Sequence, residues 1–231
     1  MTPAHYTLHY APDNASLVIR LALEEIGTSY STKLVDRRKN EQKSGSYRTL
    51  NPSGLIPVLE TEDGPIFETA AILLWLIDKH KALGPAPDAP ERADFLKWLF
   101  FLSNTVHPAL RRLFYAHYYI GDDPRDHTTL RCFTKEKIRE HLRIVDVRWQ
   151  SHPPPSLALA VYLMPMLRWL ALYPANIDRS WFVLKDFPTL YSAAAEFEAR
   201  PASLKVSLLE GLGKNPFTQP QPPNPPEGSA T

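Results

Sequence analysis

Cysteine is almost absent from this sequence, because Cys132 is the single one among 231 residues. One cysteine excludes an intramolecular disulfide framework, a CxxC redox pair and a zinc site built on cysteines. It agrees with a reducing compartment. Since Cys132 falls within a predicted long helix, we expect its thiol to be buried and unreactive.

Long apolar runs and an excess of one charge are also missing. The longest runs, Ala70–Ile77 and Leu157–Leu167, are shorter than the ~18 residues that a transmembrane helix needs. Lys and Arg total 26 and Asp and Glu total 25, which argues against nucleic-acid or membrane partners. The start, MTPAHYTLHY, lacks a basic segment followed by an apolar core, so we expect no signal peptide and a cytoplasmic protein.

A proline-rich linker divides the chain into two expected domains. Residues 85–90 lie within GPAPDAP, which contains three prolines and one glycine, a composition typical of linkers. Before it, in the domain 1–84, strand and helix patterns alternate: 6–10, 16–26, 29–35, 55–59, 65–67 and 70–80. After it, in the domain 91–212, the period is helical: 91–119, 127–150, 156–173, 187–199 and 202–211. The sequence therefore predicts an α/β domain followed by an all-α domain.

The tail, residues 213–231, carries six prolines and few apolar side chains. Such a segment cannot bury enough surface to fold alone. Two alternatives stay open: the tail is disordered, or it lies extended across the body through Phe217.

Polar groups gather where the first predicted strand meets the first predicted helix. The unpaired N–H groups at a helix start attract anions, and Tyr10, Asn14 and Ser16 could add hydroxyl or amide donors. The alternative is that Asp13 or Asn14 only caps the helix and Tyr10 packs in the sheet.

A proline interrupts the apolar segment GLIPVL at 54–59. Proline cannot donate to a strand ladder. A cis bond before Pro57 would turn the backbone groups of Ile56 outward, where they could pair with an extended peptide. A trans proline at a strand end is the other interpretation.

Glu68 and Thr69 stand directly before the predicted helix 70–80. The N-terminus of that helix favours a carboxylate, with Thr69 as its cap, and Glu68 could accept from an ammonium group. The pair predicts a ligand with a zwitterionic head such as an amino acid, although a plain cap beside a solvated Glu68 would look the same.

Six segments together resemble the cytosolic glutathione transferase family over residues 5–212. They are YAPDNASLVIRLALEE at 10–25, NPSGLIPVLE at 51–60, GPIFETAAILLWL at 64–76, LRWLALYP at 167–174, DFPTLYSAAAEFEARP at 186–201 and the closing LLEGL. The resemblance implies a thioredoxin-like domain followed by an all-α domain, a homodimer, glutathione as co-substrate and no metal.

The resemblance also implies roles for residues of the first domain. Leu55, Ile56 and Pro57 would hold the cysteinyl backbone of glutathione, and Glu68 with Thr69 would hold its γ-glutamyl group. The opening turn is most similar to the bacterial beta class, whose cysteine falls on Ala15 here, so a mixed disulfide with the protein is excluded at that position.

Without that cysteine, other groups must stabilise the glutathione thiolate. We rank Ser16 first, Asn14 second and Tyr10 third. The basic run Arg37–Lys39 is either a solvated face or a partner for the glycyl carboxylate.

In the second domain, the resemblance assigns Asn104 and His107 to the glutathione site, whereas His107 could instead be a satisfied helix residue before a proline kink. Phe114, Tyr115 and Tyr118 would form an aromatic wall for a flat hydrophobic electrophile. Core and dimer packing would use the same residues.

The function implied is a detoxifying transferase that activates the glutathione thiol for attack on a small hydrophobic electrophile. Two alternatives remain open at this point. One is a non-catalytic glutathione-binding or interaction module of the same fold. The other is a glutathione-dependent lyase, isomerase or dehalogenase.

Overall fold

The computed structural model describes residues 6–151 and 156–230. In them, four strands form a mixed sheet in the order β2-β1-β3-β4. The strands are β1 (Tyr6–Tyr10), β2 (Tyr30–Leu34), β3 (Val58–Thr61) and β4 (Gly64–Phe67). β1 and β2 are parallel, and the other two pairs are antiparallel. The predicted thioredoxin-like α/β domain is confirmed.

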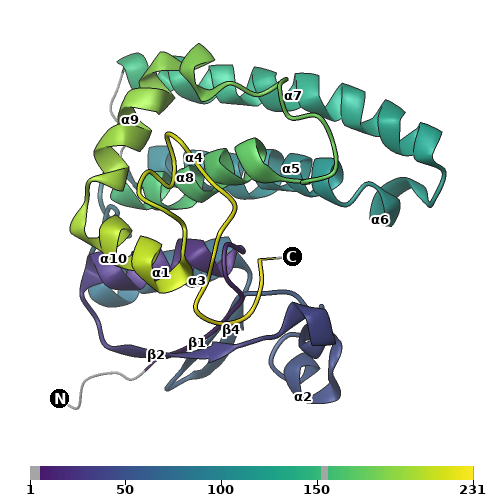
Figure 1. Ribbon diagram of the computed structural model, residues 1–231. Helices are drawn as coiled ribbons and strands as arrows, with labels where there is room; N and C mark the ends of the chain where they lie inside the picture. The colour runs from purple at the N-terminus through teal and green to yellow at the C-terminus, as the bar shows by residue number, and fades with distance from the viewer. Residues whose placement is uncertain (1–5, 152–155, 231) are drawn as a thin grey trace.

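Helices cover one face of this sheet, and a short helix lies beside one end of it (Figure 1). α1 (Ser16–Ile26) and α3 (Thr69–His80) lie between the sheet and the helical domain. The turns η1 (Arg37–Lys39) and η2 (Glu41–Lys43) lead into the short α2 (Gly45–Arg48). Tyr47 of α2 packs in a small separate cluster with Val35 and Val58. The loop between β2 and β3 is thereby fixed to the sheet.

Helices are the regular secondary structure of the described residues of the second domain, as predicted. Its elements are α4 (Arg92–Phe101), η3 (Leu102–Val106), α5 (His107–Phe114), α6 (His117–Ile120), α7 (Pro124–Ser151), α8 (Leu157–Leu172), η4 (Leu184–Asp186), α9 (Pro188–Glu198) and α10 (Pro201–Glu210). One apolar core continues from the sheet through α1 and α3 into these helices. Among the described helices, none is long and apolar enough to cross a membrane.

Three local predictions were wrong. The single helix expected over 91–119 is divided into α4, the π-helical turn η3, α5 and α6. Pro108 has no N–H for the carbonyl of residue 104, which accounts for η3, and α5 ends where Tyr115 leaves the helical conformation. The strand expected over 55–59 begins only at Val58, since Pro57 cannot donate to the ladder. Cys132 is exposed on α7 rather than buried.

The proline-rich tail lies extended across the body, which is the second of the two alternatives (Figure 1). Phe217 is buried against Phe197, with ring centroids 5.5 Å apart. The Glu198 carboxylate accepts from the backbone N–H groups of Phe217 and Thr218 and from the Thr218 hydroxyl. The tail is therefore held by specific polar contacts as well as by one apolar anchor.

The tail also approaches the end of α10 very closely. The Asn224 N–H donates to the Gly211 carbonyl at 2.8 Å. Gly211 has a φ of 63°, and a Cβ placed there would lie 2.0 Å from the Asn224 carbonyl oxygen. Gly213 also has a positive φ, 88°, but a Cβ there would meet no atom within 4 Å.

This pair of glycines provides a test of the tail contact. Gly213→Ala should lower the free energy of unfolding by ~1–2 kcal/mol, the usual cost of a left-handed alanine. Gly211→Ala carries that cost and should lose a further ~1–3 kcal/mol, because the methyl group displaces the tail. Urea unfolding measures both, and equal losses would contradict the observed tail contact.

Candidate active site

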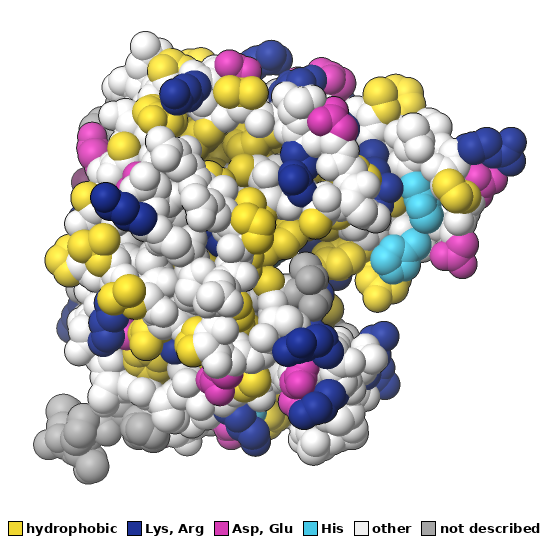
Figure 2. All heavy atoms as spheres, viewed as in Figure 1, with side chains coloured by type: hydrophobic (Ala, Val, Ile, Leu, Met, Phe, Trp, Pro, Cys, Tyr) yellow, Lys and Arg dark blue, Asp and Glu magenta, His cyan; other side chains and the backbone are white. Residues whose placement is uncertain are grey.

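Two neighbouring cavities lie between the domains. The first has a volume of about 550 Å³ and the second about 460 Å³. In Figure 2 apolar side chains show in the hollow between the α5–α6 region and the α2 region, with Lys and Arg near its edge. The two cavities meet at five shared residues: Ala15, Leu55, Ile56, His107 and Arg111.

The second cavity gathers every residue that the sequence assigned to glutathione. These are Leu55, Ile56, Pro57, Glu68, Thr69, Asn104 and His107. Thr69 begins α3 and is buried, whereas Glu68 is exposed and has a φ of 70°. No side chain caps the N-terminus of α3, so its first N–H groups are available to an anion.

The loop that carries Ile56 is fixed by side chains. The Leu55 carbonyl accepts from the Tyr47 hydroxyl at 2.9 Å and from the Asn51 amide at 2.8 Å. The Ile56–Pro57 peptide bond is cis, as one of the two interpretations of the sequence had it. Ile56 itself lines both cavities.

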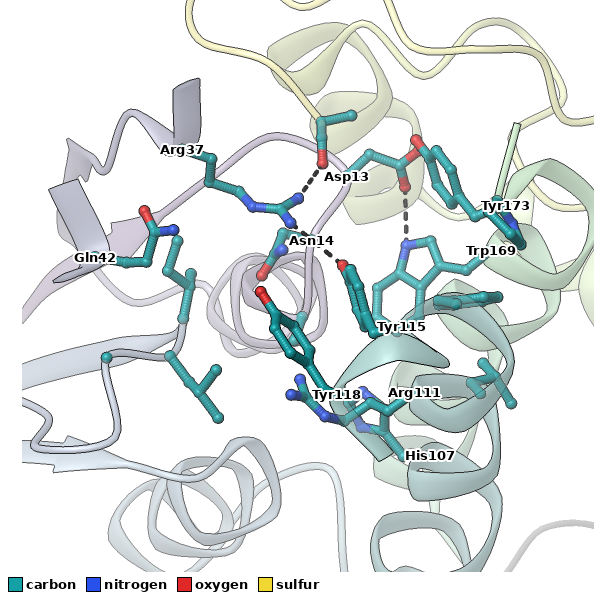
Figure 3. A pocket seen from close by; sticks show the side chains of 18 of the residues that line it. Asp13, Asn14, Arg37, Gln42, His107, Arg111, Tyr115, Tyr118, Trp169 and Tyr173 are labelled. Carbon is teal, nitrogen blue, oxygen red and sulfur yellow. Dashed lines mark hydrogen bonds between the residues drawn. The ribbon is translucent and has the colours of Figure 1, made fainter. Parts of the chain in front are cut away.

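The first cavity has the expected aromatic wall. Phe114, Tyr115 and Tyr118 line it. Figure 3 shows Tyr115 and Tyr118 reaching from the helical side toward Arg37 and Asn14 on the sheet side. Arg37 donates to the Tyr115 hydroxyl at 3.2 Å and also to the Ala230 carbonyl. The end of the tail thus forms part of the cavity rim.

Sequence reasoning missed two aromatic members of this wall, both from α8 or its end. Trp169 lies 5.8 Å from His107 and Tyr173 lies 6.4 Å from Phe114, measured between ring centroids. Their segment, LRWLALYP, was part of the resemblance. Nothing in its apolar pattern distinguishes a cavity wall from core.

Of the three residues proposed for the thiolate, the structure places only Asn14 on a cavity. The Ser16 side chain is fully buried, and its hydroxyl donates to the Ala11 carbonyl at 3.0 Å. Tyr10 is buried and donates to the Glu227 carboxylate. Burial, followed by Glu227, raises the pKa of Tyr10 far above its ordinary value. Neither Ser16 nor Tyr10 lines either of these two cavities, so their positions do not favour a direct contact with a ligand there, whereas the position of Asn14 does.

Asp13, which the sequence suggested as a helix cap, is instead a buried anchor. Its carboxylate accepts from Arg168 Nε at 3.0 Å, from Trp169 Nε1 at 2.9 Å and from the Tyr173 hydroxyl at 2.7 Å. Its own N–H donates to Glu210 at 2.8 Å. Arg168 is the single charged residue in the apolar sequence of α8, and this lone charge was the signal that could have revealed the partner of Asp13.

His107 is a neutral member of the site. Its Nδ1 lies 3.1 Å from the Tyr162 hydroxyl. Burial, and after it the positive charge of Arg111, lowers the pKa of His107 to about 4. His107 therefore contributes a hydrogen-bonding ring rather than a positive charge at neutral pH.

Comparison with known proteins agrees with the geometry. The family described as glutathione S-transferase, N-terminal domain, matches residues 4–78. Glutathione S-transferase F14 of Arabidopsis thaliana is 30% identical over 199 residues, which cover 81% of this chain and 77% of that protein. The chain belongs to the glutathione S-transferase family.

Other matches are partial or structural. Glutathione S-transferase F10 of A. thaliana is 35% identical over 96 residues, or 40% of this chain and 45% of that protein, so this match spans less than half the length of that relative. A glutathione transferase of Burkholderia graminis, solved with two glutathione molecules per subunit, has a TM-score of 0.75 and 26% identity. It covers 87% of this chain and 86% of that one.

Removing the Arg168 guanidinium should destabilise the protein strongly. In Arg168→Met the buried Asp13 carboxylate loses its charged partner, and the carbonyls of Leu212, Pro216 and Gln221 lose their donor. We expect the free energy of unfolding to fall by ~3–5 kcal/mol, the usual cost of breaking a buried ion pair. Urea denaturation measures the change.

Arg125→Met is the matched control, since Arg125 pairs with Asp123 at the surface and should lose less than ~1 kcal/mol. Equal losses in Arg125→Met and Arg168→Met would show that the buried pair is not a structural anchor.

Because the pKa of His107 is lowered in the folded protein, we expect the free energy of unfolding to fall in acid. Because the unfolded chain binds the proton near pH 6.5 and the folded protein only near 4, His107 destabilises the fold as pH falls through that window. The free energy of unfolding of His107→Gln should therefore decline less from pH 6.5 to 4 than that of wild type.

The exposed His117→Gln is the control and should follow the wild-type profile. A nuclear magnetic resonance titration of the His107 ring should show a midpoint near 4. A midpoint close to 6.5 would contradict the prediction.

Proposed function

We propose that this protein is a glutathione transferase that binds glutathione in the second cavity and an electrophile in the first. One observation carries the proposal. The two cavities meet at Ala15 and Ile56, so a thiol held at that junction faces both the start of α1 and the aromatic wall. Family membership and the glutathione-bound neighbour support the choice of thiol.

Glutathione has a chemically matched partner for each of its ends. Glu68 accepts from the γ-glutamyl ammonium, and the N-terminus of α3 with Thr69 receives the neighbouring carboxylate. The backbone of Ile56 pairs with the cysteinyl residue, as an added strand would. Arg37 lines the first cavity and is the proposed partner of the glycyl carboxylate.

The thiolate is stabilised by the start of α1 and by Asn14. No side chain caps α1, and its first turn holds no acidic residue. The N–H groups of Leu17 and Val18 donate to the Asn14 and Ala15 carbonyls, so the N–H groups of Ala15 and Ser16, together with the helix dipole, are the ones that favour a negative sulfur. The thiol proton leaves to solvent, and the thiolate attacks the electrophile. Among the described cavity residues there is no cysteine, so we propose that glutathione supplies the reactive sulfur, consistent with Ala15 at the beta-class cysteine position.

From the family resemblance alone, we further propose that the protein is most similar to the beta class, forms a homodimer, is cytoplasmic and acts in detoxification. The non-catalytic module and the glutathione-dependent lyase, isomerase or dehalogenase are the functions against which the experiment below is designed.

An ultraviolet difference titration with glutathione tests the function. A saturable thiolate signal should be present near neutral pH. Asn14→Ala should raise the pKa of the bound thiol by about one unit, because one donor to the sulfur is lost. Ser16→Ala should leave that pKa unchanged, since Ser16 lies outside both cavities.

Glu68→Gln separates binding from activation. It should weaken glutathione binding in calorimetry by ~1–3 kcal/mol, because the ammonium loses a charged acceptor. Saturable glutathione binding with no thiolate until well above neutral pH would favour the non-catalytic module. A thiolate signal without transfer to any arylating electrophile would favour another glutathione-dependent reaction.

A further inference from the structure

The first cavity is more cationic than a pocket for neutral hydrophobic compounds requires. Arg37, Lys43, Arg48 and Arg111 line it. The single carboxylate among its described lining residues is that of Asp13, which is buried and already accepts from Arg168, Trp169 and Tyr173. The cavity therefore carries a positive field that no acidic group of its own wall neutralises.

Arg111 differs from the other three cations in the domain that carries it. Arg37, Lys43 and Arg48 come from the sheet domain, while Arg111 comes from α5 and lines both cavities. Its guanidinium lies 5.7 Å from the centre of the Tyr115 ring. Within the described part of the chain, Arg111 has no ion pair and no hydrogen bond to a carboxylate.

Three other arginines whose side chains are largely withdrawn from water have acidic partners. Arg20 pairs with Glu210, Arg92 with Asp78 and Arg148 with Asp94. A guanidinium withdrawn from water normally needs such a partner. Arg111 is partly withdrawn into a cavity wall, and a bound anion would supply the acidic partner that it lacks.

The two charged or titratable neighbours of Arg111 on α5, Arg112 and His107, do not provide a positive charge in the cavities. Arg112 shares the last turn of α5 with Arg111, where any cation is favoured by the helix dipole, but Arg112 lines neither cavity. His107, one turn before Arg111, is neutral at physiological pH. Arg111 is thus the permanent positive charge that α5 presents at the junction of the cavities.

In the proposed binding mode, neither carboxylate of glutathione contacts the Arg111 guanidinium. Its γ-glutamyl carboxylate lies at the start of α3 and its glycyl carboxylate lies toward Arg37 on the sheet side. The aromatic wall of Phe114, Tyr115 and Tyr118 surrounds the remaining space. A second ligand there meets rings suited to a flat molecule and a cation suited to an acidic substituent.

We propose that the electrophile accepted by the first cavity is an aromatic organic anion and that Arg111 binds its acidic group. The proposal rests on the proposed transferase function and names its substrate class. A guanidinium forms two parallel hydrogen bonds with a carboxylate or sulfonate. Such a contact would orient the ring so that its reactive carbon faces the sulfur at the junction.

A pair of matched electrophiles tests this specificity. Para-chloro-meta-nitrobenzoate and the amide of the same acid react with glutathione by the same substitution at the carbon para to the acid or amide group. The thiolate attacks the carbon that bears chlorine, a C–S bond forms, and chloride leaves with the electrons of the C–Cl bond. The thiol proton has already gone to solvent, so no redox partner is needed. Each kcat/KM is divided by the uncatalysed rate constant, which removes the intrinsic difference in reactivity.

Wild type should favour the benzoate over the amide. Arg111→Gln should lower the normalised kcat/KM for the benzoate about tenfold or more, because a charge-assisted contact is lost, and change the amide value less than about threefold. Arg111→Lys keeps the charge and should restore part of the preference. Arg112→Gln, on the same helix turn, should change neither substrate. An equal loss for both substrates in Arg111→Gln, or the same selectivity loss in Arg112→Gln, would overturn the proposal.

A binding measurement keeps the test independent of turnover. Calorimetry with meta-nitrobenzoate, which has no leaving group, is done with and without S-methylglutathione. A Kd about tenfold weaker in Arg111→Gln than in wild type supports the anion site even if neither electrophile is turned over. The same Kd in both proteins overturns it. Failure of glutathione itself to bind would instead reject the proposed function, so the two failures are distinguishable.

Discussion

The buried pair between the Asp13 carboxylate and the Arg168 guanidinium is the contact on which the site depends. Both side chains are fully excluded from solvent, and taking two charges out of water costs several kcal/mol for each ion. Donors from Trp169 and Tyr173 complete the hydrogen bonding of the carboxylate and offset that cost. Because Asp13 directly precedes Asn14, this contact fixes the start of α1 relative to α8.

The same guanidinium determines where the tail lies. Arg168 donates to the carbonyls of Leu212, Pro216 and Gln221, and the tail then continues until the Ala230 carbonyl meets Arg37. Composition alone could not choose between a disordered and an extended tail. The acceptors are backbone carbonyls, which leave no mark in a sequence, and the donor lies in a distant helix.

Local signals in the sequence predicted the fold well, because most strands and helices each follow from nearby residues. Residues of the second cavity were also identifiable: Ile56, Glu68 and Thr69 lie close before a strand or at a helix start, whereas Asn104 and His107 came from the family resemblance alone. Ser16 and Tyr10 were misplaced for a different reason. Asp13 has a φ of 47°, and this left-handed residue helps set which side chains of the loop face the cavity. A tertiary contact holds Asp13 in place, so propensity could not reveal it.

The placement of His107 and Arg111 depends on the irregular turn before them. Consecutive residues of an α-helix are rotated by about 100° about the helix axis. The π-helical turn η3 (Leu102–Val106) adds residues without a regular α-helical turn, so every later side chain of α5 is rotated relative to α4. Pro108 makes this turn favourable by removing one N–H from the helix. In a regular helix continuing from α4, His107 and Arg111 would point in a different direction. The direction of the Arg111 side chain therefore depends on the π-helical turn η3, which Pro108 favours.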